Sequence, residues 1–349
     1  MGLSSRILLG VIFALGCGKD AREADAQNER VELSDGWLAM GTFFEVDLRV
    51  RKSEIPVAKT WLAWAKVELV RLEAVYSRHD DASQISALNR SLAKPAALAA
   101  GIEIGPALEA VLVESVDVWE ATGGAFDVTV GPLVEVWTRA AERSAWPSVE
   151  ILRKAKDRVG SERLRLSGNG RLEVTASRVR IDLDAVAKGA ALDYLGDALT
   201  RVLPDAAALI NLGQSSALAI GDPDGGGWIL AVKSSDASAG ELATLRLRDR
   251  ALSVSSSLGS VSEIAGQQVS HIIDPRTGST VEGTVEAVVI AERATQADGW
   301  STGLLVLGAQ RSTIRLVEKA GLEAFVFDSS GRTVSSAGWE AYLAQSPRE

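Results

Sequence analysis

Cysteine and histidine are both scarce in this chain of 349 residues. The only cysteine is Cys17, and the only histidines are His79 and His271. A single cysteine rules out an intramolecular disulfide. Three such residues are also too few for the usual tetrahedral zinc site, so no zinc centre of that kind is expected.

An excess of positive charge is missing as well. The chain has 37 Lys and Arg against 46 Asp and Glu, which gives a net charge of −9 and a pI near 5.1. This balance argues against nucleic-acid binding through a general basic surface. An acidic protein can still hold a phosphate through a metal or backbone amides, so a nucleotide substrate is not excluded. The hydrophobic content of 46% suffices for one large domain or two intimate ones.

The N-terminus lacks an apolar run long enough to span a membrane. Ile7–Leu15 is apolar and follows Arg6, and Cys17 comes two residues later. This pattern is typical of a secretory signal that ends in a lipobox, where the cysteine is lipidated. The match is imperfect because Ala14 and Leu15 stand where Leu and a small residue are usual. An ordinary signal peptide with an incidental cysteine is the alternative. Residues 18–32 are polar and predict a flexible tether.

The hydropathy pattern of residues 33–345 predicts a single large α+β unit. Alternation with period two predicts a strand over Leu38–Val50, and helical spacing predicts helices over Pro56–Tyr76 and residues 105–122. Other helices are expected after a Ser83 cap, at 148–158, from 185 to about 203, at 299–307 and at 339–344. Other strands are expected at 208–220, 228–233, 243–247, 251–254, 286–291 and 325–327, with a hairpin over 164–183. Helices that interrupt antiparallel strands indicate α+β rather than strict βαβ alternation.

Asp298 and Thr302 form a candidate metal-binding pair. They stand four residues apart at a predicted helix start, so both side chains can face one side. A carboxylate and a hydroxyl suit magnesium, which keeps waters and takes further ligands from a phosphate. The spacing is common, however, and helix capping explains it equally well.

His271 is the candidate proton acceptor. It precedes Asp274–Gly278, where proline presets φ and glycine closes a turn. Such a turn would hold the imidazole rigidly at a cleft edge, as a general base requires. Asp182 and Lys188 flank the passage into another predicted helix, whose N-terminus offers amides to an anion. A structural histidine and a capped helix with a surface lysine remain the simpler alternatives.

Seven segments resemble, in order and with similar spacing, those of the ApbE family of FAD:protein FMN transferases. They are Met40–Thr42, Ser77–Asn89, Thr122–Thr129, Asp182–Gly189, Asn211–Gly213, His271–Gly278 and Ala297–Thr302. Each segment is a weak or moderate signal alone. Their shared order over nearly the whole mature chain makes the resemblance specific.

The resemblance implies a magnesium-dependent enzyme that transfers the FMN half of FAD to a Thr or Ser hydroxyl of a target protein and releases AMP. Asp298, Thr302 and the backbone carbonyl of Ala185 would bind magnesium, and His271 would take the proton. The FAD site would be lined by Met40, His79, Ala125, Phe126, Asp127, Asp182, Lys188 and Ile272. The implied partners are FAD, a flavin-acceptor protein and, through a lipid on Cys17, a bacterial membrane facing the periplasm or cell exterior.

The sequence departs from the family pattern at three places. His79 stands where an aromatic residue, usually Tyr, is common. Gln214-Ser215-Ser216 replaces a usual Gly and acidic residue, and a serine run at Ser253–Ser257 replaces a Thr-Ser-Gly-type segment; both are expected to border the cleft. Two alternatives therefore stay open: an FAD pyrophosphatase that gives FMN and AMP, and a non-catalytic flavin-binding lipoprotein.

Overall fold

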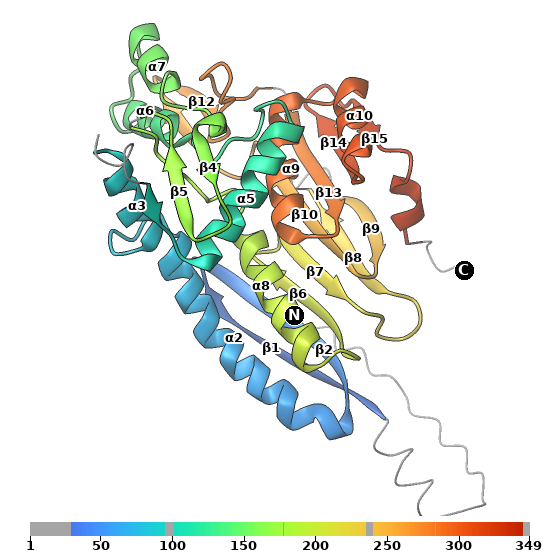
Figure 1. Cartoon of the computed structure of the whole chain (residues 1–349). Helices are drawn as coiled ribbons and strands as arrows, with labels where there is room; N and C mark the ends of the chain where they lie inside the picture. The colour runs from blue at the N-terminus through green and yellow to red at the C-terminus, as the bar shows by residue number, and fades with distance from the viewer. Residues whose placement is uncertain (1–28, 95–100, 177, 235–239, 283, 345–349) are drawn as a thin grey trace, which may run out of the picture.

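A computed structural model describes residues 29–94, 101–176, 178–234, 240–282 and 284–344 (Figure 1). Cys17, the predicted signal sequence and the tether up to residue 28 lie outside these residues. Within the described ranges, none of the helices combines the length and apolarity that crossing a membrane requires.

The centre of the fold is an antiparallel sheet of eight strands in the order β1-β2-β6-β7-β10-β13-β14-β15 (Figure 1). These are β1 (Arg30–Ala39), β2 (Thr42–Arg51), β6 (Ala207–Leu212), β7 (Ser216–Ile220), β10 (Arg250–Ser256), β13 (Thr284–Ala291), β14 (Glu323–Asp328) and β15 (Thr333–Ser335). Successive side chains of a strand point to opposite faces. In β13, Ala287 and Val289 therefore enter one core, and Val288 and Ile290 enter another.

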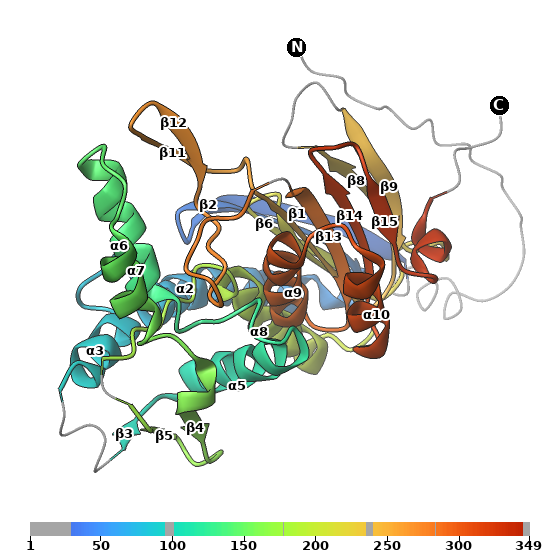
Figure 2. The same cartoon turned by 90° about the horizontal axis from the view of Figure 1, so that it is seen from above.

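Helices cover one face of this sheet, and a β-hairpin covers the other (Figure 2). The helices are α2 (Ile55–Tyr76), α5 (Pro106–Ala121), α8 (Ala187–Val202), α9 (Ala294–Leu307) and α10 (Arg311–Lys319). The hairpin consists of β8 (Trp228–Lys233) and β9 (Glu241–Leu247). Trp228 and Leu245 of this hairpin pack with Ala217, Leu252 and Ile290 of the sheet. Both faces of the central strands are thus buried, which explains the apolar runs in β6, β7 and β13, whereas β1 and β2 keep one exposed face.

Smaller elements surround one end of the helical layer. They are α3 (Gln84–Leu92), α6 (Gly131–Glu142), α7 (Val149–Lys156), the sheet of β3 (Ile102–Glu103), β5 (Arg171–Val174) and β4 (Leu164–Leu166), the hairpin of β11 (Val261–Ile264) and β12 (Gln267–Ser270), and the 3-10 turn η2 (Ser161–Arg163). Of the other 3-10 turns, η1 (Lys52–Glu54) joins β2 to α2, and η3 (Trp339–Tyr342) packs beside β9 and β14. The β11–β12 hairpin projects beside α6 (Figure 2), where Ile264 and Val269 pack on Ala140.

The α+β class predicted from the sequence is confirmed, but two predicted strands are hairpins. Leu38–Val50 contains the turn between β1 and β2, and residues 208–220 contain the turn between β6 and β7. The alternation continues through both turns, so periodicity alone does not reveal them. Strand β1 also includes Arg30–Glu32, which the sequence analysis placed in the tether. Helices α6 and α10 and the β11–β12 hairpin were not predicted.

Helix α9 begins at Ala294, so the prediction that Asp298 and Thr302 lie at a helix start is wrong. Its first turn is capped by Asp193 of α8, which accepts hydrogen bonds from the amides of Ala294 (2.8 Å) and Thr295 (2.9 Å) and from the Thr295 hydroxyl (2.6 Å). The cap comes from a residue distant in the sequence, and local capping rules cannot find it. Asp298 and Thr302 still share a helix face, as predicted.

The cap predicts that substitutions at two acidic residues of α8 lower the unfolding free energy by very different amounts. Asp193 has a side chain that is 5% exposed, whereas Asp197 is 54% exposed, and both contact Arg293. Replacing Asp193 with Asn leaves a buried donor facing donors and is expected to cost about 1–3 kcal/mol of unfolding free energy. Asp197→Asn removes only a solvated ion pair and is expected to cost at most about 1 kcal/mol. Urea unfolding followed by tryptophan fluorescence measures both, and equal losses would contradict the assignment.

Candidate active site

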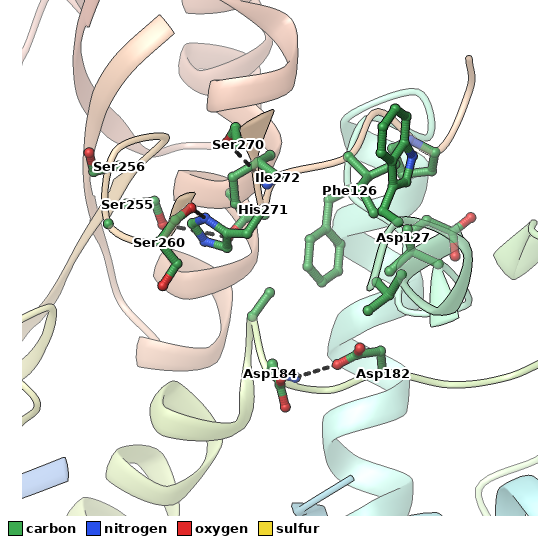
Figure 3. Close-up of a pocket in the computed structure, with 18 of the residues that line it drawn as sticks. Phe126, Asp127, Asp182, Asp184, Ser255, Ser256, Ser260, Ser270, His271 and Ile272 are labelled. Atoms are coloured by element: carbon green, nitrogen blue, oxygen red, sulfur yellow. Dashed lines mark hydrogen bonds between the residues drawn. The ribbon is translucent and has the colours of Figure 1, made fainter. Parts of the chain in front are cut away.

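A cavity of about 540 Å³ brings together most residues that the sequence analysis singled out. That volume is in the range of small-molecule sites. The predicted residues that line it are Ala125, Phe126, Asp127, Asp182, Ala185, Lys188, His271, Ile272, Asp298 and Thr302. They come from the loop before α6, the turn before α8 and the first turn of that helix, the segment after β12 and the middle of α9 (Figure 3).

Met40 and His79 do not line this cavity. Met40 lies in the β1–β2 turn, where its amide donates to Glu73 Oε2 (3.2 Å) and its side chain packs against the main core. The His79 side chain is 69% exposed, with Nε2 3.5 Å from Asp184 Oδ2. Neither residue is among those that line the cavity, but His79 contacts Asp184, which is one of them.

His271 is held by a backbone carbonyl. Its Nδ1 lies 2.7 Å from the oxygen of Ser260, and its backbone amide donates to the same oxygen (3.2 Å). A carbonyl oxygen only accepts, so Nδ1 carries the hydrogen. In the neutral imidazole, Nε2 then keeps its lone pair, which is the form that accepts a proton. The side chain is exposed to the cavity on the side of the serine-rich β10–β11 loop (Figure 3).

The predicted turn after His271 is present and is tightly bonded. Asp274 accepts from the amide of Gly278 (2.8 Å) through its backbone, and its carboxylate binds the amide and guanidinium of Arg276. Gly278 adopts φ +82°, which favours glycine. Its carbonyl accepts from Trp137 Nε1 of α6 (2.9 Å). These bonds fix the segment that carries His271 against the unpredicted helix α6.

Asp127 contributes to the cavity wall, but its carboxylate forms hydrogen bonds with the neighbouring segments of the chain. Its Oδ1 accepts from the amide (2.7 Å) and hydroxyl (2.6 Å) of Thr129 and from the Ser161 hydroxyl (2.7 Å). Burial raises the pKa of this carboxyl, and the hydrogen bonds oppose that rise. In Figure 3 the carboxylate points away from His271, whereas the neighbouring Phe126 ring points into the space between His271 and Asp182.

A charged cluster that the sequence analysis missed forms another part of the wall. Arg78 Nε lies 3.1 Å from Asp182 Oδ2 and 2.6 Å from Asp184 Oδ2, and the Asp184 amide donates to Asp182 Oδ1 (3.1 Å). Desolvation and the neighbouring Asp184 raise the pKa of Asp182 to about 6, and Arg78 opposes that rise. Arg78 and Asp184 stand beside the predicted residues His79 and Ala185, but only the fold reveals their pairing.

Asp298 lies at the junction of two helices and the sheet. Its Oδ2 accepts from the amide of Gly189 in α8 (2.7 Å), and its Oδ1 accepts from the hydroxyl of Ser216 in β7 (2.8 Å). The residue is 3% exposed, and no Lys, Arg or His of the described residues pairs with it. A buried carboxylate without a cationic partner is costly, which makes this the natural place for a cation.

The donors near Asp298 are oxygen atoms. Thr302 and Ala185 line the same cavity and offer a hydroxyl and a main-chain carbonyl. Nowhere in the described ranges do three His, Cys, Asp or Glu side chains gather in a way that could hold a metal. One carboxylate with neutral oxygens suits magnesium, which commonly keeps waters and shares ligands with a substrate phosphate. The residues present therefore fit the ion that the resemblance implied.

Comparison with known proteins identifies the family. The sequence profile of the ApbE family matches residues 40–326, a stretch that contains every wall residue named above. The chain belongs to the ApbE family. The FAD:protein FMN transferase of Klebsiella pneumoniae (strain 342) is 30% identical over 341 residues, 93% of this chain and 92% of that protein. The protein of the same name from Escherichia coli K12 is 25% identical and covers 97% and 96%.

Solved structures of ApbE proteins share the fold. The ApbE protein of Thermotoga maritima superimposes with a TM-score of 0.78 at 24% identity, over 91% of this chain and all of that chain (100%). The apo form of the flavinyl transferase ApbE of Pseudomonas stutzeri gives 0.77 at 22% identity, over 91% and 98%. The ApbE fold expected from the seven segments is therefore confirmed.

The charged cluster of Arg78, Asp182 and Asp184 predicts opposite changes in the pKa of Asp182 in two variants. Asp184→Asn removes a negative neighbour and should lower the pKa of Asp182 below about 6, whereas Arg78→Gln removes a cation and should raise it. Carboxyl ¹³C NMR of aspartate-labelled protein measures the midpoint, with Asp81→Asn as an exposed control. Unchanged midpoints in both variants would contradict the cluster.

The raised pKa of Asp182 also determines how the stability of the protein changes with pH. The folded-state pKa of Asp182 lies above its ordinary value of 3.8, so the folded state holds this proton more tightly than the unfolded chain. The contribution of Asp182 to stability is complete below that ordinary value and is lost as the pH rises through about 6. Asp182→Asn should therefore flatten this part of the curve of unfolding free energy against pH.

Proposed function

We propose that this ApbE-family protein is a magnesium-dependent FAD:protein FMN transferase that links FMN to a Thr or Ser hydroxyl of an acceptor protein and releases AMP. The observation that carries the proposal is the presence of His271, with a free Nε2, and the Asp298–Thr302 pair in the wall of one cavity. The names of the relatives support the same reaction. Export and lipid anchoring are part of this proposal, and the signal-like pattern before Cys17 supports them.

The reaction requires a base for the acceptor hydroxyl. The hydroxyl oxygen attacks the FMN phosphorus of FAD, the bridging P–O bond to AMP breaks, and the hydroxyl proton passes to His271 Nε2. The bond from Nδ1 to Ser260 places the hydrogen of the neutral ring on Nδ1, which leaves the Nε2 lone pair as the acceptor and orients the ring. The Asp274–Gly278 turn prevents the His271 segment from moving away.

The phosphates need positive charge and hydrogen-bond donors. Lys188 in the first turn of α8 lines the cavity, and its side chain pairs with no other described residue. It is therefore available to a phosphate oxygen. Arg78 is already neutralised by Asp182 and Asp184, so its main role here is to shape the wall.

Asp298, Thr302 and the carbonyl of Ala185 would hold the magnesium ion. When bound, the ion would offset the charge of the pyrophosphate and make its phosphorus more electrophilic. The hydrogen bonds from Gly189 and Ser216 occupy one lone pair on each Asp298 oxygen and leave others for a ligand. The α8–α9 contact thus presents the carboxylate in a fixed orientation.

The two histidines provide a matched test of the base. The His271→Ala variant should lose FMN transfer by about 10²- to 10⁴-fold, the usual contribution of a general base, while FAD binding is largely kept. His79→Ala should retain transfer, because that exposed side chain lies outside the cavity wall. The assay incubates the protein with FAD, magnesium and an acceptor domain that carries a flavinylation motif, and follows acceptor fluorescence and AMP.

The products of this assay separate the competing functions. A labelled acceptor with equal AMP supports transfer. FMN and AMP without labelling would replace the proposal by FAD hydrolysis, and bound FAD without AMP over hours would leave only flavin binding. Equal loss of FAD binding and transfer in His271→Ala would make His271 structural.

Asp298 provides the corresponding test of the ion. Asp298→Asn keeps the shape of the side chain but removes its charge, and AMP release at saturating FAD should fall by at least about a hundredfold. Circular dichroism checks that the variant is folded. Full magnesium-dependent turnover by the folded variant would show that Asp298 is only a structural acceptor.

A further inference from the structure

We infer that Ser216 and Ser255, two serines of the central sheet, are positioning residues for the cation site, each orienting one of the two side chains that would bind the ion. Ser216 donates to Asp298, and Ser255 contacts Thr302. The inference rests on the proposed function, because it concerns the ion that Asp298 and Thr302 would hold. Both serines lie in the segments that depart from the family pattern.

The sheet places these serines directly under α9. Ser216 of β7 pairs in register with Ser253 of β10, and Ser255 follows two residues later on the same face. That face is the helical one, because Ala251 and Leu218 in the same alternation belong to the main core. Ser216 and Ser253 are buried, so their hydroxyls need partners from α9.

The number of hydroxyl hydrogens fixes the direction of each bond. Ser301 donates its only hydroxyl hydrogen to the backbone oxygen of Asp298 (2.9 Å), since a carbonyl cannot donate. Its contacts with Ser253 (3.0 Å) and Ser255 (2.7 Å) must therefore use Ser301 as acceptor. Both sheet serines donate to Ser301.

The same count determines how Thr302 is oriented. Ser255 has given its hydrogen to Ser301, so it can only accept from Thr302, whose Oγ1 lies 3.5 Å away. A Thr302 hydroxyl that donates to Ser255 turns its hydrogen towards the sheet. The lone pairs of Oγ1 are then left for the cavity, which is the orientation that a cation needs.

Ser216 likewise orients the carboxylate of Asp298. With Gly189 on one carboxylate oxygen and Ser216 on the other, the plane of the carboxylate is set by two different elements. Groups that orient a metal ligand commonly change metal affinity by about 10- to 100-fold when removed. Loss of the Ser216 hydroxyl frees one oxygen to rotate away from the cavity.

Manganese binding to the whole protein tests this inference without relying on activity. Mn²⁺ is used as a paramagnetic probe, and its free fraction is read by electron paramagnetic resonance in the absence of FAD. Ser216→Ala should weaken Mn²⁺ binding by about tenfold or more, and Ser255→Ala should weaken it by a smaller factor. Ser255→Thr keeps the hydroxyl and should restore the affinity.

Ser253→Ala is the matched control. It removes the same group from the same strand face, but the Ser253 hydroxyl reaches only Ser301 and neither ligand. Its Mn²⁺ affinity should stay within about twofold of the wild type, since it lies outside the set that orients the ligands. Thermal unfolding of each variant shows whether the fold is kept.

The outcomes distinguish this inference from the proposed function. No Mn²⁺ binding by the wild type, or unchanged binding by Asp298→Asn, would overturn the cation site and the inference with it. Binding that requires Asp298 but is unchanged in Ser216→Ala and Ser255→Ala would overturn only the role of the serines. Equal weakening in Ser253→Ala would also overturn it, because the effect would then follow burial rather than contact with a ligand.

Discussion

The hydrogen bonds to the Asp298 carboxylate are the constraint on which the cavity depends. They join α9 to α8 through Gly189 and to the sheet through Ser216. The close approach of the helices requires glycine at 189, where a Cβ would lie 2.3 Å from the carbonyl oxygen of Ala294. Asp193 adds the reverse connection by capping α9 from α8. The position of the predicted metal ligand is therefore determined by the close contact between α8 and α9 rather than by a surface loop.

The other walls are held by different forces, and this difference has consequences for recognition. His271 is fixed by main-chain hydrogen bonds and a tight turn, which change little with pH or salt. The Asp182 side of the cavity is fixed by ion pairs of Arg78 with the buried Asp182 and the half-exposed Asp184, and protonation of these carboxylates weakens the pairs. His271 and Asp298 are thus held by hydrogen bonds to the main chain and to Ser216, whereas the wall around Asp182 is held by charge pairs.

The sequence predicts the fold class and most of the site because those features leave local signals. Period-two and helical patterns reveal most of the strands and helices, and the turn chemistry at Asp274–Gly278 reveals the His271 segment. The failures have a common physical cause. The α9 start depends on Asp193, and the acid cluster depends on Arg78 meeting Asp184 from a distant segment. Such contacts between remote residues have no spacing rule. Ser253 and Ser255 are two residues apart in one strand and so share a face. That spacing was the available signal that both face α9.

The serine substitutions bear on whether the site is intact. A cleft that has lost its function would be free to accumulate buried hydroxyls without partners, each of which costs about 1–3 kcal/mol. Here Ser216, Ser253 and Ser255 all form hydrogen bonds, and all of these bonds end on α9 at or beside the predicted ligands. Two of these serines, Ser216 and Ser255, contact the predicted ligands themselves, whereas Ser253 bonds only to Ser301. The departures from the family pattern therefore leave none of these three serine hydroxyls without a partner beside Asp298 and Thr302.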